Sequence, residues 1–237
     1  MAILALASCV QAAVGFAAAL LGLPLLLWAG NNLMEAQILI FTAMLPQNLF
    51  AVWKLRKSID YREIIIPATV RIIAMPLGVA GLIVVMTWPD SAVNRLVGIL
   101  ILAALACQLL VGVEWKSAKK WYWILITFGG SGVLQGLSGT SGPPLVLWVH
   151  GQRYAADRAR AFLFAIYVTN FLPQLLMLWL RFGESIWRPV ILAFLSLPLV
   201  LVGATIGLRI GSRLGDQRLR TVSYVCLGIL ALVNLIG

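Results

Sequence analysis

Residues 135–144 read Gln135-Gly136-Leu137-Ser138-Gly139-Thr140-Ser141-Gly142-Pro143-Pro144, in the middle of a long apolar segment. Glycine carries a backbone entropy cost in a helix, and proline removes a donor and clashes with the preceding turn, so this stretch should not form continuous helix. Irregular backbone inside a bilayer persists only where protein or a water-filled cavity satisfies its polar groups. We therefore predict a broken segment at membrane depth, which is where transporters place their substrate.

The composition of the chain indicates an all-α polytopic membrane protein. Of its 237 residues, 62% are hydrophobic and 11% are charged, whereas a soluble domain has about 45–50% apolar and about 25% charged residues. The net charge of +10 comes from residues placed between apolar segments, so we interpret them as topology determinants and expect no nucleic-acid partner. Cys9, Cys107 and Cys226 have no metal-binding spacing, so we expect buried inert thiols, no metal site and no cofactor.

Eight apolar segments follow one another along the chain. A membrane-spanning helix needs about 20 apolar residues. Six segments fit that length, whereas the first and the fifth approach 30 residues and carry glycine and proline in their middle. The segments are 2–29, 36–53, 64–86, 96–113, 121–149, 159–180, 190–208 and 221–236.

The two long segments resemble each other. Gly22-Leu23-Pro24-Leu25-Leu26-Leu27-Trp28 matches Gly142-Pro143-Pro144-Leu145-Val146-Leu147-Trp148, and the later Leu45-Pro46-Gln47 matches Leu172-Pro173-Gln174. Similarity at a fixed spacing indicates an internal duplication. We predict one membrane domain, 1–237, built from repeat 1 (1–115) and repeat 2 (116–237), each a broken helical hairpin followed by three spanning helices.

The positions of lysine and arginine predict how these repeats are oriented. If both long segments are re-entrant hairpins, fourteen basic residues share one face and three lie on the other, which is a clear positive-inside signal. The fourteen lie in 54–62, 116–120, 153–160 and 209–220, and the three are Arg95, Arg181 and Arg188. Three spans per repeat then give the repeats inverted topology. Only the fifth segment must be re-entrant for this result, so the side of the N-terminus stays open.

At these residues the chain resembles the TauE/SafE family of membrane permeases, the sulfite exporter family. The stretch 15–24, Gly15-Phe16-Ala17-Ala18-Ala19-Leu20-Leu21-Gly22-Leu23-Pro24, is similar to the family's first G-F-x-x-x-L-x-x-x-P motif, and 135–144 is similar to its second, Q-G-x-x-G-x-S-G-P-P. The resemblance covers nearly the whole chain. It implies a multi-pass permease of a bacterial-type inner membrane, for small sulfur-containing anions such as sulfite or organosulfonates, without fixing which one.

Two hairpins that enter from opposite faces would bring helix ends to the midplane, where unpaired N–H groups favour an anion. Hydroxyl donors and glycines occur together in the second hairpin, and we predict that Ser138, Gly139, Thr140, Ser141 and Gly142 line a substrate site. The alternative is that these small residues only permit close helix packing.

Arg71 is the one charged residue deep inside a predicted span, nine positions after Arg62, or about 13 Å at the helical rise. An arginine in the membrane suggests function, and its donors suit a sulfonate. The alternative is an arginine that pairs with backbone carbonyls.

Further polar residues flank the predicted breaks. We expect Gln47, Gln135, Asn170 and Gln174 to line the site, or else to cap carbonyls that proline leaves free. Gly15 and Phe16 join the candidate site from the first hairpin.

The acidic residues lie in loops or at span ends, so no carboxylate relay crosses the membrane. An anion that leaves a negative-inside cell gains about 2.3 kcal/mol per charge per 100 mV, so efflux needs no coupling ion. We expect an exporter whose partners are the bilayer and a small anion, with a homo-oligomer left open.

Two other functions remain as alternatives. A passive anion channel would use the same residues. Gly136-Leu137-Ser138-Gly139 also spells the GxSG of rhomboid proteases, but His150 lies at the far end of the same segment, whereas a serine nucleophile needs a base within hydrogen-bond reach. We therefore expect a permease and not an enzyme.

Overall fold

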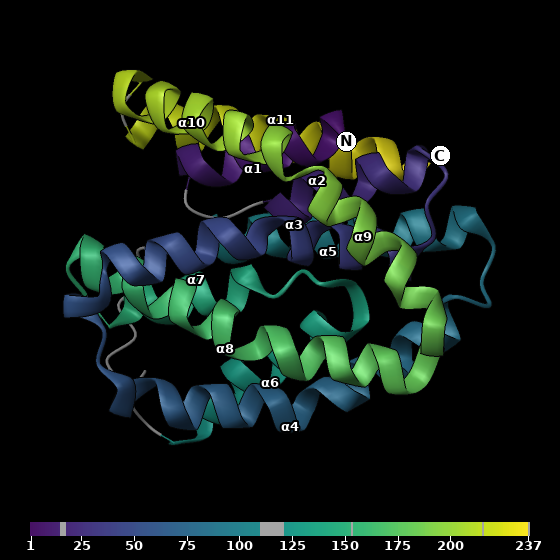
Figure 1. Ribbon diagram of the computed structural model, residues 1–237, viewed down its shortest axis with the longest axis horizontal. Helices are drawn as coiled ribbons and strands as arrows, with labels where there is room; N and C mark the ends of the chain where they lie inside the picture. Colours follow the sequence, from purple (N-terminus) through teal and green to yellow (C-terminus); the bar gives the residue numbers. More distant parts are fainter. Residues whose placement is uncertain (15–17, 110–120, 153, 215, 237) are drawn as a thin grey trace. The chain divides into compact units, whose positions relative to one another are not determined.

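The computed structural model describes residues 1–14, 18–109, 121–152, 154–214 and 216–236, and within these ranges all regular structure is helical (Figure 1). The helices are α1 (Ala2–Val14), α2 (Ala18–Trp28), α3 (Leu33–Lys54), α4 (Tyr61–Val85), α5 (Asp90–Leu109), α6 (Trp121–Ser138), α7 (Gly142–Gly151), α8 (Ala156–Phe182), α9 (Trp187–Leu195), α10 (Leu197–Leu214) and α11 (Asp216–Ile236), with short 3-10 turns η1 (Arg56–Ser58) and η2 (Gly183–Ile186).

Several helices have the length and composition to cross a membrane. Among the described residues, Leu33–Lys54, Tyr61–Val85 and Asp157–Leu195 are long and apolar enough to span, and shorter apolar helices occupy Ala2–Ala13, Ala18–Trp28, Leu197–Ile210 and Val225–Leu235. This pattern confirms the prediction of an all-helical polytopic membrane protein, whereas the inverted repeats stay a prediction.

The exposed surface of helix α4 is suited to contact with lipid. Its exposed face carries Ile65, Ile73 and Leu77, which are 62%, 71% and 69% exposed, while its buried face carries Arg71, which is 0% exposed. In a soluble protein the large apolar side chains would be inside and the charge outside. The reversed arrangement suits a helix that has lipid on one side and a polar interior on the other.

The helices form two compact units that differ from the predicted repeats. Unit 1 consists of Met1–Met44, Ile83–Leu105 and Glu184–Gly237, and unit 2 consists of Leu45–Leu82 and Ala106–Gly183. Each unit therefore combines segments from both halves of the chain.

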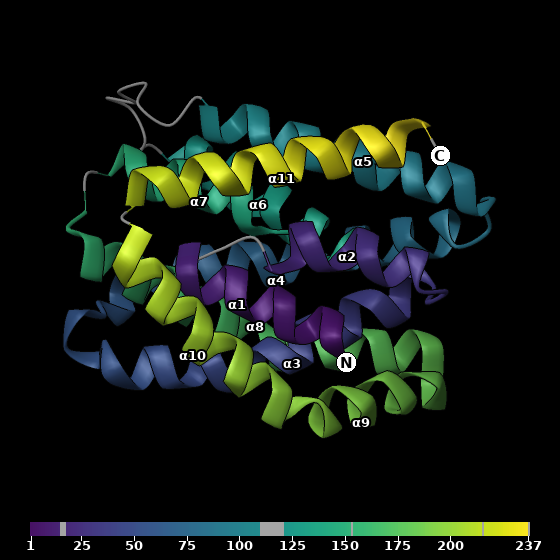
Figure 2. The ribbon, with the colours of Figure 1, turned by 90° about the horizontal axis from the view of Figure 1, so that it is seen from above.

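In unit 1, helix α10 lies across helix α1 (Figures 1 and 2). Gly203 and Gly207 of α10 lie so close to the carbonyl groups of Ala5 and Cys9 that a Cβ at either glycine would collide with backbone. Small residues four apart commonly permit such close approach of helices in membranes. The hydroxyl of Ser8 donates to the carbonyl of Val200 at 2.9 Å and joins the same two helices.

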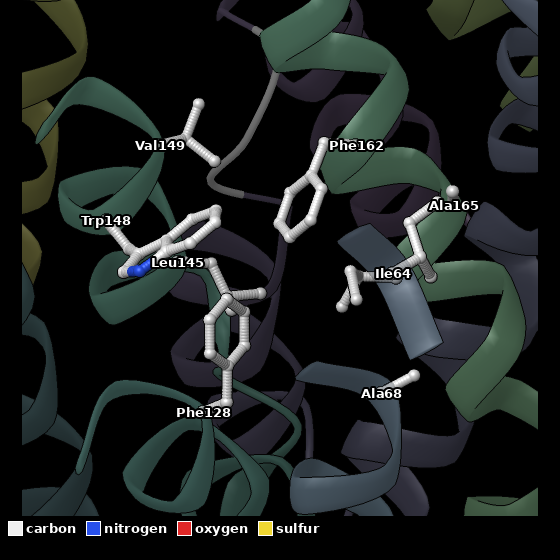
Figure 3. Packing of buried hydrophobic residues seen from close by; sticks show 9 residues of the cluster. Ile64, Ala68, Phe128, Leu145, Trp148, Val149, Phe162 and Ala165 are labelled. Atoms are coloured by element: carbon white, nitrogen blue, oxygen red, sulfur yellow. The ribbon is translucent and has the colours of Figure 1, made fainter. Parts of the chain in front are cut away.

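In unit 2, helix α7 folds back along α6. Phe128 of α6 contacts Trp148 of α7 with ring centroids 5.0 Å apart, and nearer the turn the Ser131 hydroxyl donates to the carbonyl of Ser141 at 2.9 Å. These rings belong to a buried cluster that also joins α4 and α8 (Figure 3). The cluster consists of Ile64, Ala68, Phe128, Leu145, Trp148, Val149, Phe162, Ala165 and Ile166.

The break in the second hairpin is shorter than the sequence predicted. Only Gly139–Ser141 leave the helix, whereas 135–138 continue α6 and 142–144 begin α7. The stretch does not form continuous helix, as predicted, but its non-helical part covers only three of the ten residues. The reason is that prolines are tolerated in the first turn of a helix, where the missing N–H would have no intrahelical partner. The turn itself needs glycine, because Gly139 has φ 72°.

The predicted seventh span, 190–208, is divided into α9 and α10 at Ser196. The proline at 198 has no N–H to continue the ladder, and the hydroxyl of Ser196 donates to the carbonyl of Ala193 at 2.7 Å, so side-chain and main-chain donors compete for the same carbonyls. In α4, by contrast, Pro67 and Pro76 lie inside a continuous helix.

Candidate functional site

Three helices of unit 2 bring Arg71, Gln135 and Gln174 together in a buried polar row. The guanidinium Nη2 of Arg71 on α4 donates to Oε1 of Gln135 on α6 at 3.4 Å. The amide of Gln135 donates to Oε1 of Gln174 on α8, and Nε2 of Gln174 donates back to the main-chain oxygen of Gln135 at 3.2 Å. The two glutamines therefore fix each other, and one carbonyl oxygen is left directed at Arg71.

Helical spacing explains why α4 presents Arg71 to this row. Ile64, Ala68, Arg71 and Met75 are separated by three or four residues and so share one face of the helix. Ile64 and Ala68 pack in the aromatic cluster, which fixes the rotation of α4 and turns Arg71 inward. The row thus lies directly beyond the apolar cluster along the same helix face.

Glycines bring α4 and α6 close enough for the row to form. A Cβ on Gly132 would meet the backbone of Arg71, and a Cβ on Gly136 would meet the backbone of Met75 and Val79. Gly78 of α4 is equally tight against the backbone of α6. Close packing of α4 and α6 at these positions therefore coexists with a buried cation.

Arg71 carries an unbalanced charge. It is the one charged side chain among the described residues that is buried, and its Nε and Nη1 atoms have no hydrogen-bond partner there. No acidic group of the described part lies within ion-pair distance of it. A guanidinium has five N–H donors and no acceptor, so most of its donors remain available. This arrangement differs from an arginine that caps backbone carbonyls.

The hydroxyl groups of the break bond within the hairpin itself. Ser138 Oγ donates to the carbonyl of Leu134 at 3.2 Å, and it lies 2.6 Å from Thr140 Oγ1. Ser141 is buried, and its carbonyl accepts from Ser131. These contacts hold the turn at Gly139 in place and use donors that the sequence assigned to substrate.

Tyr167 is a polar residue of this region that sequence reasoning missed. A Cβ on Gly142 would lie 3.4 Å from the Tyr167 hydroxyl, so the phenol faces the first residue of α7. Tyr167, Asn170 and Gln174 share one face of α8 because they are three and four residues apart, and this spacing was the signal available in the sequence. Asn170 donates to the carbonyl of Ile166 at 2.7 Å, and its Oδ1 is buried without a partner in the described part.

Three predicted site residues remain, namely Gln47, Gly15 and Phe16. Gln47 belongs to unit 2 and is half-buried with an interaction of its own. Gly15 and Phe16 lie outside the described residues, so their expected contribution stays a prediction.

A second polar cluster lies beside the aromatic cluster of unit 2. The sequence analysis did not predict it. Glu63 of α4 accepts from the Tyr154 hydroxyl at 2.9 Å and from Arg158 of α8 at 2.9 Å. The Arg158 guanidinium also lies over the Tyr154 ring, 4.7 Å from its centroid. Burial, followed by the hydrogen bond and negative charge of Glu63, raises the pKa of Tyr154 well above its usual range. Tyr154 therefore stays protonated and donates.

The comparisons with known proteins agree with this description. The family model for the sulfite exporter TauE/SafE matches residues 1–234. Neither curated proteins nor solved structures give a significant match. Members of the matched family are membrane transporters and not enzymes, which agrees with the apolar helices of this chain. The chain is a transmembrane permease and belongs to the TauE/SafE sulfite exporter family.

Proposed function

We propose that this permease exports a small sulfur-containing anion, of the sulfite or organosulfonate class, and that Arg71 binds this anion near the bilayer midplane. The observation that carries the proposal is that the buried guanidinium of Arg71 has no negatively charged partner in the described part. The side chain is 0% exposed, and its Nε and Nη1 atoms have no hydrogen-bond partner there. Removing a charge from water without a partner costs several kcal/mol. An oxyanion would supply the missing charge and accept from the free donors.

Further features of unit 2 support this assignment. Gln135 holds one edge of the guanidinium and is itself held by Gln174, so the cation is oriented before an anion arrives. Preorganisation of this kind reduces the entropy lost on binding. Tyr167 adds a hydroxyl that faces Gly142, the first residue of α7. Both Ser138 and Thr140 then support the turn, and Ser141 and Asn170 extend the polar region around it.

Export follows from the direction of the electrical force. An anion that leaves a negative-inside bacterial cell across its inner membrane gains about 2.3 kcal/mol per charge per 100 mV. The acidic residues of the chain with described side chains, including Glu63, are exposed or half-buried, and they provide no buried proton relay. Efflux therefore needs no coupling ion.

A binding assay in detergent tests the role of Arg71. Methanesulfonate and sulfite should raise the midpoint of thermal unfolding of the wild type, because a ligand that binds only the folded form stabilises it, by about 2.7 kcal/mol at a hundred times Kd. Arg71→Gln should lose this shift. Arg181→Gln is the matched control, since Arg181 also lies in unit 2 but is exposed. An equal shift in the wild type and Arg71→Gln would refute the proposed site.

Counterflow in proteoliposomes tests the transport mechanism. A carrier accelerates uptake of labelled sulfite when unlabelled sulfite is trapped inside, and the flux saturates. A flux that neither saturates nor responds to trapped anion would assign the chain to the channels instead.

A further inference from the structure

We infer that the Arg71 site selects its substrate by charge, so that it binds monoanions and excludes dianions. This inference rests on the proposed function and narrows the substrate class to organosulfonates and hydrogensulfite, with the sulfite dianion and sulfate excluded.

The described residues of the site carry a single positive charge. Arg71 is the one buried charged side chain of the described part, and its polar neighbours Gln135, Gln174 and Tyr167 are neutral. The other basic side chains with described positions are exposed or half-buried. Arg158, the basic side chain placed at the end of the same helix group, is already paired with Glu63 at 2.9 Å.

The neutral polar groups of the site cannot supply the second positive charge that a dianion would need. The two glutamine amides are bonded to each other, and the hydroxyls of Ser138 and Thr140 bond within the hairpin. Gln135 and Gln174 orient the guanidinium, but none of these groups contributes net charge. A bound ligand therefore has one full charge to compensate it.

A monoanion and Arg71 form a neutral pair, whereas a dianion would leave one negative charge buried without a partner. Burying an uncompensated charge is strongly unfavourable in a medium of low dielectric, and hydrogen bonds from neutral groups offset only part of that penalty. The unliganded site has the opposite imbalance, with one positive charge uncompensated. Binding a monoanion removes that imbalance, which is why the charge of the ligand decides its affinity.

Sulfur oxyanions differ in net charge, although the arrangement of their oxygen atoms is similar. Alkyl sulfonates carry one charge throughout the physiological pH range, and sulfate carries two. Sulfite changes from hydrogensulfite to the dianion near neutral pH. All of them present oxygen atoms that suit bidentate contact with a guanidinium, so shape alone would not separate them.

Competition binding to the wild-type protein in detergent tests the inference. Methanesulfonate, sulfite and sulfate are compared between about pH 6 and about pH 8.5. We expect the apparent Kd for sulfite to rise about tenfold per pH unit once the dianion predominates, since the bound form is then a falling fraction of the total. Methanesulfonate affinity should stay flat, which controls for titration of the protein. Sulfate should compete at least a hundredfold more weakly than methanesulfonate.

Either of two results would overturn charge selection: sulfate that binds within tenfold of methanesulfonate, or sulfite affinity that does not change with pH. Arg71→Lys keeps the charge with fewer donors, so it should lower affinity for methanesulfonate while sulfate remains the weaker ligand. If Arg71→Gln binds all three anions as the wild type does, the proposed site itself fails. If binding requires Arg71 but sulfate equals methanesulfonate, only the charge selection fails.

Discussion

Replacing Gly136 with alanine should loosen the crossing of α4 and α6 on which the polar row depends. The new Cβ would meet the backbone of Met75 and Val79, and backbone cannot rotate away as a flexible side chain does. Overpacking of this kind costs about 1–3 kcal/mol. Alanine also favours helix over glycine by about 1 kcal/mol, so the net loss of stability should be smaller than the packing term alone.

Gly130→Ala on the same helix removes this ambiguity. A Cβ at Gly130 has nothing within 4 Å, so this variant gains the helix propensity without the collision. The two variants should then differ by about 1–3 kcal/mol, or roughly 2–12 °C in the midpoint of thermal unfolding for a chain of this size. Anion binding should also weaken in Gly136→Ala, because Gln135 would shift away from Arg71. Equal midpoints for the two variants would show that the close approach of α4 and α6 is not what holds this unit.

The same comparison applies to unit 1, where Gly203→Ala should destabilise the contact of α10 with α1 by about 1–3 kcal/mol relative to Gly228→Ala, whose Cβ meets nothing; indistinguishable unfolding curves would contradict it. Tyr154 has a raised pKa in the folded protein, so its contribution to stability is complete below its unfolded pKa of about 10 and is lost as the pH rises through the folded value. Wild-type stability should therefore fall above about pH 10 more steeply than that of Tyr154→Phe, and parallel pH profiles would rule this out. Single cysteines introduced at Ser117 and Gln152 in a background without other cysteines should be labelled from the same side of the membrane, and labelling from opposite sides would refute a re-entrant second hairpin.

Hydropathy and glycine–proline punctuation predicted the helices well because both depend on local chemistry. The outer ends of the helices lie within six residues of the predicted segments, and the second hairpin breaks inside the predicted stretch. The break between α9 and α10 was missed because Pro198 resembles Pro76, which lies within a continuous helix. The difference depends on what the neighbouring side chains do, here the hydroxyl of Ser196, and hydropathy carries no such information.

The candidate site was predicted less completely, since it depends on which helices meet. Arg71, Gln135 and Gln174 were each chosen for their own chemistry, and the sequence did not show that they bond to one another. Tyr167 and Glu63 were overlooked because an isolated tyrosine or a carboxylate near a span end is unremarkable until its partner is known. The hydrogen bonds of Ser138 and Thr140 within the hairpin could not be predicted either, and the role of these residues at the site stays a prediction.

The contact between α1 and α10 has a consequence for how the protein is made. Ala5 of α1 packs against Gly203 of α10, so α1 leaves the ribosome well before the helix against which it packs. At about 5–20 residues per second, this interval is about 10–40 s. Throughout that time Ser8 lacks the carbonyl of Val200 to which it donates, and a nascent chain that stops before α10 leaves α1 without this contact. The contact between α1 and α10 therefore forms late in the insertion of this protein.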